Sequence, residues 1–345
     1  MKKYIEDNYQ KFLSFIEDST EITIVGHLNP DGDCLGALIG MKNFISQRYK
    51  DKRVSIVVPT SYPSTLSFLD PDKKIFINEL QPLESKIAVE NCDLLICMDL
   101  SSPSRVEKLE ESIRSSKGRK VLIDHHLDPE SFADLTFSFT KISSTCEITY
   151  WLLKKCNQTE LLSTNILEPL CVGLITDTNN FSNSIFPSTF LMASQLIEGK
   201  VDIEKIQEKV LNSYSQERMR LMGEMLLNRM KIWDDLHSSL MILDLETQKK
   251  YNFERGDSEG FVNLPLKISD IAISGLFTQE RDYVRVSLRS KGDISVNELS
   301  KAYFNGGGHK NAAGGRLYMN IAEIPDYFEQ SVRRFVKENG ISFED

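Results

Sequence analysis

The sequence predicts an α/β protein in which a doubly wound, mainly parallel sheet is joined by a helical linker to a smaller C-terminal α/β domain with a mixed sheet. Short apolar runs alternate with helical patterns throughout the first half of the chain, which is typical of a parallel sheet with connecting helices. The predicted strands are almost continuously apolar, which fits burial on both faces of the sheet. With 345 residues, the chain is long enough for two domains.

The elements follow from these patterns in chain order. In the first half we predict strands over residues 21–26, 53–58, 93–98 and 119–123. We predict helices there over residues 34–49, 144–155 and 164–176. In the second half we predict strands over residues 238–243, 272–279 and 283–289, followed by a glycine-rich loop and a short helix.

A long helical stretch over residues 188–231 separates the two halves. Apolar residues recur at helical spacing near its end, namely Met219, Met222, Met225, Leu226 and Met230. Such a methionine stripe is more often core or packed linker than a cofactor site. We therefore divide the chain into a first domain over residues 1–190, a helical linker over residues 191–235 and a second domain over residues 236–345.

Composition limits the classes of function. The formal net charge of −9 argues against tight binding of long duplex DNA, which needs a broad basic surface. No apolar run approaches the ~18 residues that cross a bilayer, and the N-terminus carries acidic residues where a signal peptide would be apolar. We therefore predict a soluble cytoplasmic chain with no membrane partner. The six cysteines form no CxxC pair and are expected to be buried thiols.

One segment departs from the acidic balance. Residues 281–316 contain seven basic and three acidic residues, a local charge of +4. A solvated basic face would explain this run, but its position near the motifs described below favours an anion-binding pocket.

Chemically competent side chains follow the predicted elements at four places. They are His27 to Asp33 after the first strand, Asp99 after the third, Asp124-His125-His126 after the fourth, and Asp177 to Phe181 after a helix. Ligands of open α/β sheets gather at the carboxyl ends of the strands, so three of these loops should meet at one edge. Each motif alone could be an ordinary turn or cap, but four together at one edge are much less probable by chance. Neither a phosphate-binding P-loop nor a G-x-S-x-G nucleophile elbow is present in the sequence.

Clustered carboxylates repel one another unless cations or protons neutralise them. Two divalent ions would balance four aspartates, with two neutral imidazoles completing the coordination. The predicted ligands are His27, Asp31, Asp33, Asp99, His125 and Asp177. Oxygen-rich ligands with one imidazole per ion suit manganese, with magnesium or cobalt as substitutes. Two such ions can share a bridging hydroxide that attacks phosphorus, which predicts a two-metal phosphoesterase.

These residues also resemble a known family. HLNPDGDCLG, the single Asp99, Asp124-His125-His126 and DTNNF resemble, in order, the four motifs of the DHH phosphoesterase superfamily. The later VSLRSKGDISV and FNGGGHKNAAGG resemble its DHH-associated C-terminal domain of the first type. Two positions depart from the usual pattern: Asn179 stands where Gly is common, and Ala37 where Ser is common. Asn tolerates left-handed backbone, so the turn can survive.

The resemblance assigns roles to individual residues. It makes residues 1–190 the catalytic domain and residues 236–345 the substrate-binding domain. His27, Asp31 and Asp99 would hold one ion, and Asp33, Asp99, His125 and Asp177 the other. Asp124 would orient His125, and His126 would steady the departing oxygen or act as an acid.

The C-terminal domain would supply the substrate side. Backbone amides of Gly306, Gly307 and Gly308 would face a phosphate, His309 would contact the substrate, and residues 312–315 would open a helix whose N-terminus binds anions. Arg289 is the first candidate for a phosphate clamp and Arg285 the second. The alternatives are a flexible glycine turn and arginines on an exposed strand face.

Within the superfamily, the chain is most similar to the compact stand-alone oligoribonucleases, because it lacks the extra domains of the RecJ-type and membrane-bound members. The predicted activity is hydrolysis of short oligoribonucleotides to mononucleotides and of 3′-phosphoadenosine 5′-phosphate to AMP. Substrates would be short RNA or DNA oligonucleotides or small nucleotides. Three alternatives remain open: a soluble phosphodiesterase of cyclic di-AMP or its linear dinucleotide, an exopolyphosphatase- or pyrophosphatase-like hydrolase, and a non-catalytic nucleotide sensor. A homodimer also remains open.

Overall fold

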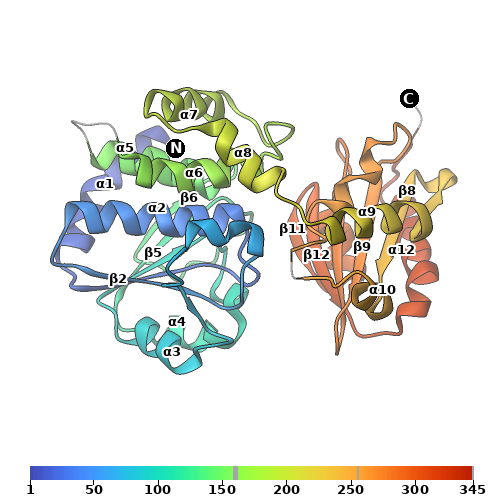
Figure 1. The fold of residues 1–345 in the computed structure, drawn as a ribbon, viewed down its shortest axis with the longest axis horizontal. Coiled ribbons are helices and arrows are strands. Elements are labelled where there is room, and N and C mark those ends of the chain that lie inside the picture. Colours follow the sequence, from blue (N-terminus) through green and yellow to red (C-terminus); the bar gives the residue numbers. More distant parts are fainter. Residues whose placement is uncertain (158–161, 255, 344–345) are drawn as a thin grey trace. The chain divides into compact units, whose positions relative to one another are not determined.

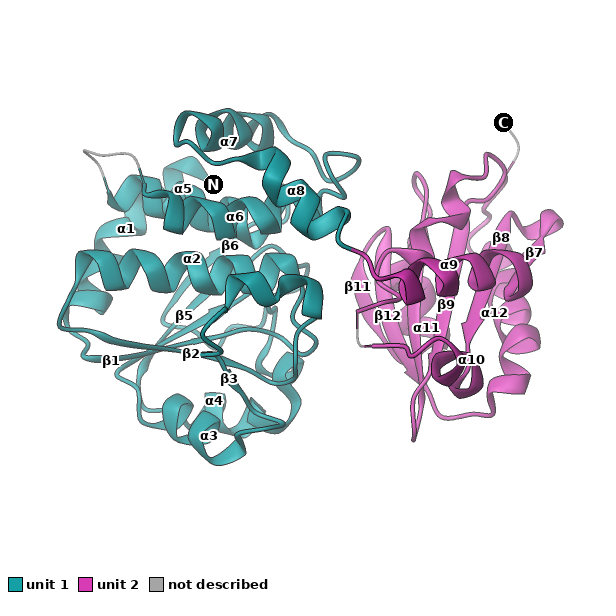
Figure 2. Ribbon diagram, in the orientation of Figure 1, with its two compact units in different colours: residues 1–213 teal, residues 214–345 magenta. Residues whose placement is uncertain are grey.

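The computed structural model describes residues 1–157, 162–254 and 256–343. The chain divides into two compact units, an N-terminal unit of Met1–Ser213 and a C-terminal unit of Tyr214–Asp345 (Figure 2). The first contains a parallel sheet and the second a mixed sheet, each with six described strands and packed helices. The predicted fold class is therefore confirmed.

The sheet of the N-terminal unit is parallel throughout. Its strands are β1 (Glu21–Val25), β2 (Arg53–Val58), β3 (Phe76–Ile77), β4 (Leu94–Met98), β5 (Arg119–Asp124) and β6 (Leu135–Ser138). Their order is β3-β2-β1-β4-β5-β6, so the chain first builds outward from β1 and then returns to add β4 on its other side. The topological switch point therefore lies between β1 and β4, which is where open α/β sheets bind ligands.

Helices cover both faces of this sheet (Figure 1). On one side are α1 (Lys2–Glu17), α2 (Gly32–Arg48), α5 (Thr145–Cys156) and α6 (Thr164–Asp177), and on the other are α3 (Pro82–Glu90), α4 (Glu110–Ser115) and the 3₁₀ helix η2 (Pro103–Leu109). A further 3₁₀ helix is η1 (Ser64–Leu69). Successive strand residues feed the two cores alternately, as the pleat dictates: Ile96 packs in the first core, whereas Leu95 and Cys97 pack in the second.

The region expected to be one long helical stretch contains three separate helices. They are α7 (Pro187–Glu198), α8 (Ile203–Leu211) and α9 (Gln216–Asn228). Helices α7 and α8 belong to the N-terminal unit and α9 to the C-terminal unit, so the structure differs from the expected linker over residues 191–235. The breaks have local causes, since Asp202 and Ser215 cap α8 and α9 with their side chains. Met225 is fully buried in a core of the C-terminal unit.

The C-terminal unit has a mixed sheet in the order β11-β12-β10-β9-β8-β7. Its strands are β7 (Met230–Trp233), β8 (Ser238–Leu243), β9 (Ile273–Gln279), β10 (Val284–Ser290), β11 (Gly307–His309) and β12 (Ala312–Leu317). Only β8 and β9 pair in parallel among the described strands of this sheet. The helices are α10 (Leu245–Lys250), α11 (Val296–Tyr303) and α12 (Ile324–Glu338), with 3₁₀ helices η3 (Asp234–Leu236), η4 (Phe261–Asn263), η5 (Pro265–Lys267) and η6 (Ile321–Glu323).

The glycine-rich segment does not form the expected helix start. Residues 312–315 lie in strand β12, and Gly307 and Gly308 lie in strand β11, which pairs with it. The glycines permit backbones to approach at distances that no side chain would allow. A Cβ on Gly306 would lie 1.8 Å from the Gly314 carbonyl oxygen, and one on Gly315 would lie 2.1 Å from the Phe304 carbonyl oxygen. These glycines therefore permit close backbone packing, of Gly306 against β12 and of β12 against the end of α11, and do not form a helix N-terminus.

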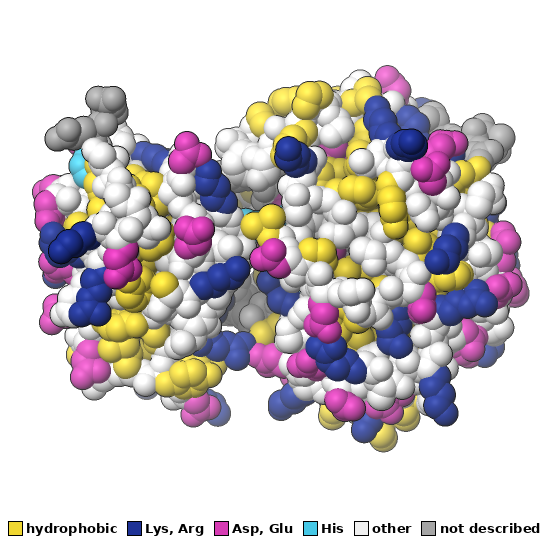
Figure 3. Space-filling model, turned by 180° about the vertical axis from the view of Figure 1, so that it is seen from behind, with side chains coloured by type: hydrophobic (Ala, Val, Ile, Leu, Met, Phe, Trp, Pro, Cys, Tyr) yellow, Lys and Arg dark blue, Asp and Glu magenta, His cyan; other side chains and the backbone are white. Residues whose placement is uncertain are grey.

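Figure 3 shows acidic and basic side chains interspersed over the visible face of each unit. Within the described residues, no helix combines the length and apolar character needed to cross a bilayer. All six cysteines are free and buried, as expected from the sequence.

Candidate active site

The six predicted ligands meet at the carboxyl edge of the parallel sheet. His27 follows β1 and Asp99 follows β4, so they lie on the two sides of the topological switch point. His125 follows β5, and Asp177 is the last residue of α6. Asp31 caps α2, and Asp33 lies in its first turn. Loops that are far apart in the sequence thus contribute side chains to one site.

His27 lies between two carboxylates. Its Nε2 is 3.3 Å from Asp99 Oδ2 and 3.8 Å from Asp31 Oδ2. Its Nδ1 donates to the Leu28 carbonyl oxygen at 2.7 Å, which turns Nε2 toward the carboxylates. Asp31 uses Oδ1 to accept the backbone N–H groups of Asp33 and Cys34, so Oδ2 is the oxygen that faces His27. Each group thus presents one atom to a common point.

His125 lies at the centre of a second set. Its Nε2 is 3.3 Å from Asp177 Oδ2, 3.6 Å from Asp99 Oδ1 and 3.8 Å from Asp33 Oδ2. Asp99 therefore belongs to both sets, with Oδ2 toward His27 and Oδ1 toward His125. Asp33 and Asp99 are almost fully buried, at 1% and 2% relative exposure.

The N-terminus of α5 holds the buried carboxylates in place. The backbone N–H groups of Thr145 and Cys146 donate to Asp33 at 2.7 and 2.8 Å, and the Thr145 hydroxyl donates to Asp99 Oδ1 at 2.9 Å. Free N–H groups at a helix N-terminus stabilise negative charge. The sequence reasoning missed Thr145, although Ser144 to Glu147 has the S-x-x-E spacing that marks a helix start.

Glu147 ties this helix start to its surroundings. It is fully buried, and it accepts hydrogen bonds from the backbone and hydroxyl of Ser143, from the Trp151 indole and from the Thr189 hydroxyl of α7. A buried carboxylate with several donors is satisfied and rigid. Glu147 thereby fixes the position of the amides that reach Asp33.

The electrostatics show that the carboxylates are crowded. Burial raises the pKa of Asp33 well above its usual value, and the charges of Asp99 and Asp177 raise it further. Burial opposes ionisation of Asp99 as well, but the imidazoles of His27, His126 and His125 outweigh it and hold the pKa of Asp99 far below its usual range. The pKa of Asp33 rises where carboxylates surround it, and the pKa of Asp99 falls where imidazoles surround it. Nearby positive charge therefore stabilises the ionised carboxylates of this site.

The pKa of the His27 imidazole also indicates that the carboxylates favour a nearby positive charge. Burial and, to a smaller extent, the charge of Arg105 lower its pKa, yet the hydrogen bond to Asp99 and the charges of Asp31 and Asp99 raise it to about 9. In the absence of a metal ion, a proton on His27 therefore supplies part of the missing positive charge.

Left-handed backbone residues gather around the site. Asp99 has φ = 58°, and Asn179, Asn180 and Phe181 have φ of 45°, 55° and 60° directly after Asp177. Such conformations cost roughly 1–2 kcal/mol each for residues with a side chain and are common at functional sites. Asn179 thus adopts the conformation that the glycine usual at this position would favour.

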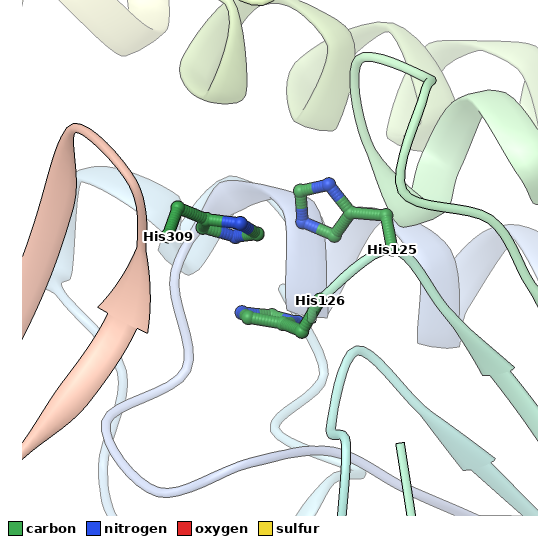
Figure 4. Close-up of side chains that lie close together, drawn as sticks. All are labelled: His125, His126 and His309. Carbon is green, nitrogen blue, oxygen red and sulfur yellow. The ribbon is translucent and has the colours of Figure 1, made fainter. Parts of the chain in front are cut away.

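Asp124 contacts His126 and not the imidazole that the family resemblance assigns to it. Its carboxylate accepts the His126 Nδ1–H at 2.8 Å and the His126 backbone N–H at 3.2 Å, whereas His125 was the expected partner. Figure 4 shows the two imidazoles beside each other, with centroids 4.8 Å apart and planes at 66°. Asp124 therefore orients His126 and leaves its Nε2 directed away from β5.

A further cation of the N-terminal unit was not predicted. Arg105 lies in η2, and its Nη2 is 3.5 Å from His126 Nε2. Its own carbonyl accepts the Leu28 N–H at 2.9 Å, which ties η2 to the loop that carries His27. The sequence signal was weak, because Arg105 stands alone among serines and valine with no motif around it.

The predicted substrate residues of the C-terminal unit lie together on one side of its sheet. Arg285 and Arg289 alternate with buried residues along β10 and so share a face. Arg289 pairs in register with Ala312, and Ala312 with His309, while Arg285 pairs with Arg316 and also lies 3.6 Å from Glu280. Three of the seven basic residues of the run, Arg285, Arg289 and Arg316, thus share one polar face of the sheet.

The glycine amides are less available than expected. The Gly308 N–H donates to Asn297 Oδ1 at 3.0 Å, and the Gly306 N–H donates to the Ser300 carbonyl at 3.3 Å. These two amides are therefore already hydrogen-bonded within the C-terminal unit, and phosphate binding by this segment stays a prediction. His309, which is labelled in Figure 4, ends strand β11 on the half-buried edge of the sheet.

Comparison with known proteins identifies the family. The model of the DHH family, N-terminal domain, matches residues 21–174, and that of the DHHA1 domain matches residues 238–338. The crystal structure of an exopolyphosphatase-related protein from Bacteroides fragilis superposes with a TM-score of 0.88 at 34% identity, covering 96% of each chain. The chain belongs to the DHH family.

Two curated proteins add detail to the DHH assignment. The probable bifunctional oligoribonuclease and PAP phosphatase NrnA of Streptococcus mutans is 28% identical over 93% of this chain and 97% of that protein. The cyclic-di-AMP phosphodiesterase GdpP of Bacillus subtilis is 26% identical over 92% of this chain, but over only 50% of its own length. As a DHH protein with this set of side chains, the chain is a phosphoester hydrolase.

Proposed function

We propose that this DHH protein hydrolyses short oligoribonucleotides to mononucleotides and 3′-phosphoadenosine 5′-phosphate to AMP, with two divalent ions, in the first instance Mn²⁺. The observation that carries the proposal is the position of Asp99, whose two oxygens face His27 on one side and His125 on the other. A shared carboxylate between two imidazole-containing sets suits a pair of ions in one site. The match to NrnA over nearly the full length of both chains supports this choice of substrates.

The side chains present fit a pair of hard divalent ions. Asp33 is buried and repelled by its neighbours, so an ion would supply the charge that a proton supplies in its absence. His27, Asp31 and Asp99 would hold one ion, and Asp33, Asp99, His125 and Asp177 the other. Carboxylate-rich sets with one imidazole each favour Mn²⁺, with Mg²⁺ and Co²⁺ as substitutes. When bound, such ions lower the pKa of water enough for attack on phosphorus and offset charge on the phosphoryl oxygens.

The residues around the metal ligands would orient those ligands, bind the substrate and contact the departing oxygen. Asp124 accepts the Nδ1–H of His126 and so fixes the orientation of its ring, which would place Nε2 of His126 toward the departing oxygen. Thr145 fixes Asp99, and the α5 amides fix both oxygens of Asp33. In the C-terminal unit, Arg289, Arg285 and His309 would bind the nucleotide phosphates through the polar sheet face.

A second candidate is hydrolysis of cyclic di-AMP or its linear dinucleotide, which the likeness to GdpP over 92% of the chain favours. A third is phosphoanhydride hydrolysis, in keeping with the description of the Bacteroides fragilis protein as exopolyphosphatase-related. Both would use the same carboxylate cluster, so they differ from the first candidate in substrate and not in mechanism.

One substrate panel separates the candidates. Release of product from a dinucleotide, a pentanucleotide, 3′-phosphoadenosine 5′-phosphate, cyclic di-AMP, pyrophosphate and tripolyphosphate would be measured in Mn²⁺, Mg²⁺, Co²⁺ and excess chelator. We expect the highest kcat/KM on the dinucleotide or pentanucleotide in Mn²⁺, clear activity on 3′-phosphoadenosine 5′-phosphate, and none with chelator. A higher kcat/KM on cyclic di-AMP or polyphosphate would replace the first candidate. Nucleotide binding without turnover in any metal would identify a sensor instead.

A further inference from the structure

We propose that Arg105 is a phosphate-binding residue of the N-terminal unit, contributed by the 3₁₀ helix after β4 and additional to the arginines of the C-terminal sheet. The inference rests on the proposed function, because it assigns the arginine to the phosphoryl group of that substrate. It concerns the N-terminal unit alone and requires no particular placement of the other unit.

The position of Arg105 is fixed by its main chain. The Leu28 N–H donates to the Arg105 carbonyl at 2.9 Å, which holds η2 against the loop of His27. Asp99 lies six residues earlier at the end of β4, so Arg105 returns to the same edge of the sheet as the ligands. Its half-buried guanidinium lies at His126, with Nη2 3.5 Å from His126 Nε2. The main chain of Arg105 therefore contacts the loop of His27, and its side chain reaches His126.

The side chain of Arg105 makes few contacts that would stabilise the fold. Across residues 1–157, 162–254 and 256–343, its guanidinium makes one hydrogen-bonding contact, the 3.5 Å approach to His126 Nε2, and pairs with no carboxylate within 4.0 Å. This is unusual beside a site with several aspartates, where an arginine that served the fold would pair with one of them. Arg114, on the next helix, shows that arrangement, because it binds both Glu110 and Glu130.

The chemistry of the group matches a phosphoryl ligand. A guanidinium offers five N–H donors in a planar fork that fits two oxygens of a phosphate. The aspartates of the cluster repel an incoming phosphate, so a cation on the rim offsets that repulsion at the point of entry. Because Nε2 of His126 lies 3.5 Å from the same guanidinium, a phosphate oxygen held by Arg105 would also lie close to His126.

The test compares Arg105→Ala, Arg105→Lys and the control Arg114→Ala in Mn²⁺-loaded full-length protein. Binding of inorganic phosphate and of AMP would be measured by isothermal titration calorimetry, Mn²⁺ stoichiometry by elemental analysis, and kcat and KM on a dinucleotide. We expect Arg105→Ala to weaken phosphate and AMP binding and to raise KM by about tenfold to a hundredfold, with unchanged Mn²⁺ stoichiometry. Arg105→Lys should lie between, since it keeps the charge but loses the fork. Arg114→Ala should match the wild type.

Unchanged phosphate binding and unchanged KM in both Arg105 variants would overturn the proposal, and so would a loss of bound Mn²⁺ without a change in phosphate affinity. Should Arg105→Ala fail to fold, Arg105→Lys carries the same test, because the carbonyl that bonds Leu28 belongs to the main chain and survives either substitution. Arg105-dependent phosphate binding in a protein that hydrolyses no nucleotide would sustain this inference while refuting the proposed function.

Discussion

Replacement of Thr145 by valine tests whether α5 prepares the site for its ions. The substitution keeps the shape of the side chain and the backbone N–H that donates to Asp33, and it removes only the hydroxyl that donates to Asp99 at 2.9 Å. A hydrogen bond to a charged acceptor contributes about 1.5–3 kcal/mol. Loss of a group that orients a ligand typically lowers metal affinity about 10- to 100-fold. We therefore expect Mn²⁺ affinity and kcat to fall by that order, measured by calorimetric titration and dinucleotide turnover.

The same helix supplies a matched control. Thr149 lies one turn after Thr145 and is equally buried, but its hydroxyl has no hydrogen-bond partner among the described residues. Thr149→Val removes an unsatisfied hydroxyl, so the free energy of unfolding should stay the same or rise by up to about 1–3 kcal/mol, with Mn²⁺ affinity unchanged. Wild-type Mn²⁺ affinity and turnover in Thr145→Val would refute the role of α5, as would an equal loss of Mn²⁺ affinity in both variants.

Further outcomes follow from the same geometry. Asp99→Asn should reduce turnover by orders of magnitude with an unchanged circular dichroism spectrum, since this carboxylate faces both imidazoles; near-normal activity would contradict its shared position. His309→Ala should raise KM about tenfold without changing Mn²⁺ content, and lost metal would show that this residue serves the ions. Gly315→Ala should lower the free energy of unfolding in urea by at least about 1–3 kcal/mol, because its Cβ would meet the Phe304 carbonyl oxygen at 2.1 Å. Gly223 lies in the open interior of α9, so Gly223→Ala should raise the free energy of unfolding by about 1 kcal/mol. Equal effects of the two substitutions would argue against close backbone packing at Gly315. In chelated protein the pKa of His27 is raised from 6.5 to about 9, so its contribution to stability is present below pH 6.5 and lost as pH rises through about 9. Mn²⁺ must displace that proton, so Mn²⁺ affinity should increase from pH 7 toward pH 9, and an affinity that does not vary with pH would count against this protonation.

The strands that carry the site could be predicted from the sequence because each is a short apolar run with a polar end. The structure gives β1, β2, β4 and β5 nearly the predicted bounds. Parallel strands bring their carboxyl ends to one edge, so the residues after β1, β4 and β5 could be grouped without coordinates. Because clustered carboxylates repel one another, the sequence also predicted that cations bind there. The raised pKa values of Asp33 and His27 agree with this prediction.

Other features could not be predicted from local patterns. Strand β3 has only two residues, too few for a periodic pattern. Helix α1 is different, because its buried residues, such as Phe12 and Ile16, recur at helical spacing; this helix could have been predicted and was overlooked. Strand β12 was mistaken for a helix start because small residues permit either conformation, and only the close approach of Phe304 decides between them. Thr145 and Arg105 act through partners more than twenty residues away in the chain, and no short motif records such contacts.

The start of α5 holds the carboxylates of Asp33 and Asp99 with groups of the protein alone, two backbone amides and the Thr145 hydroxyl. Many small metallo-domains lack such internal support for their ligands, so they fold only when the metal binds and chelators unfold them. We therefore expect this unit to keep its circular dichroism spectrum in excess chelator, which would let bound ions exchange with the medium without unfolding.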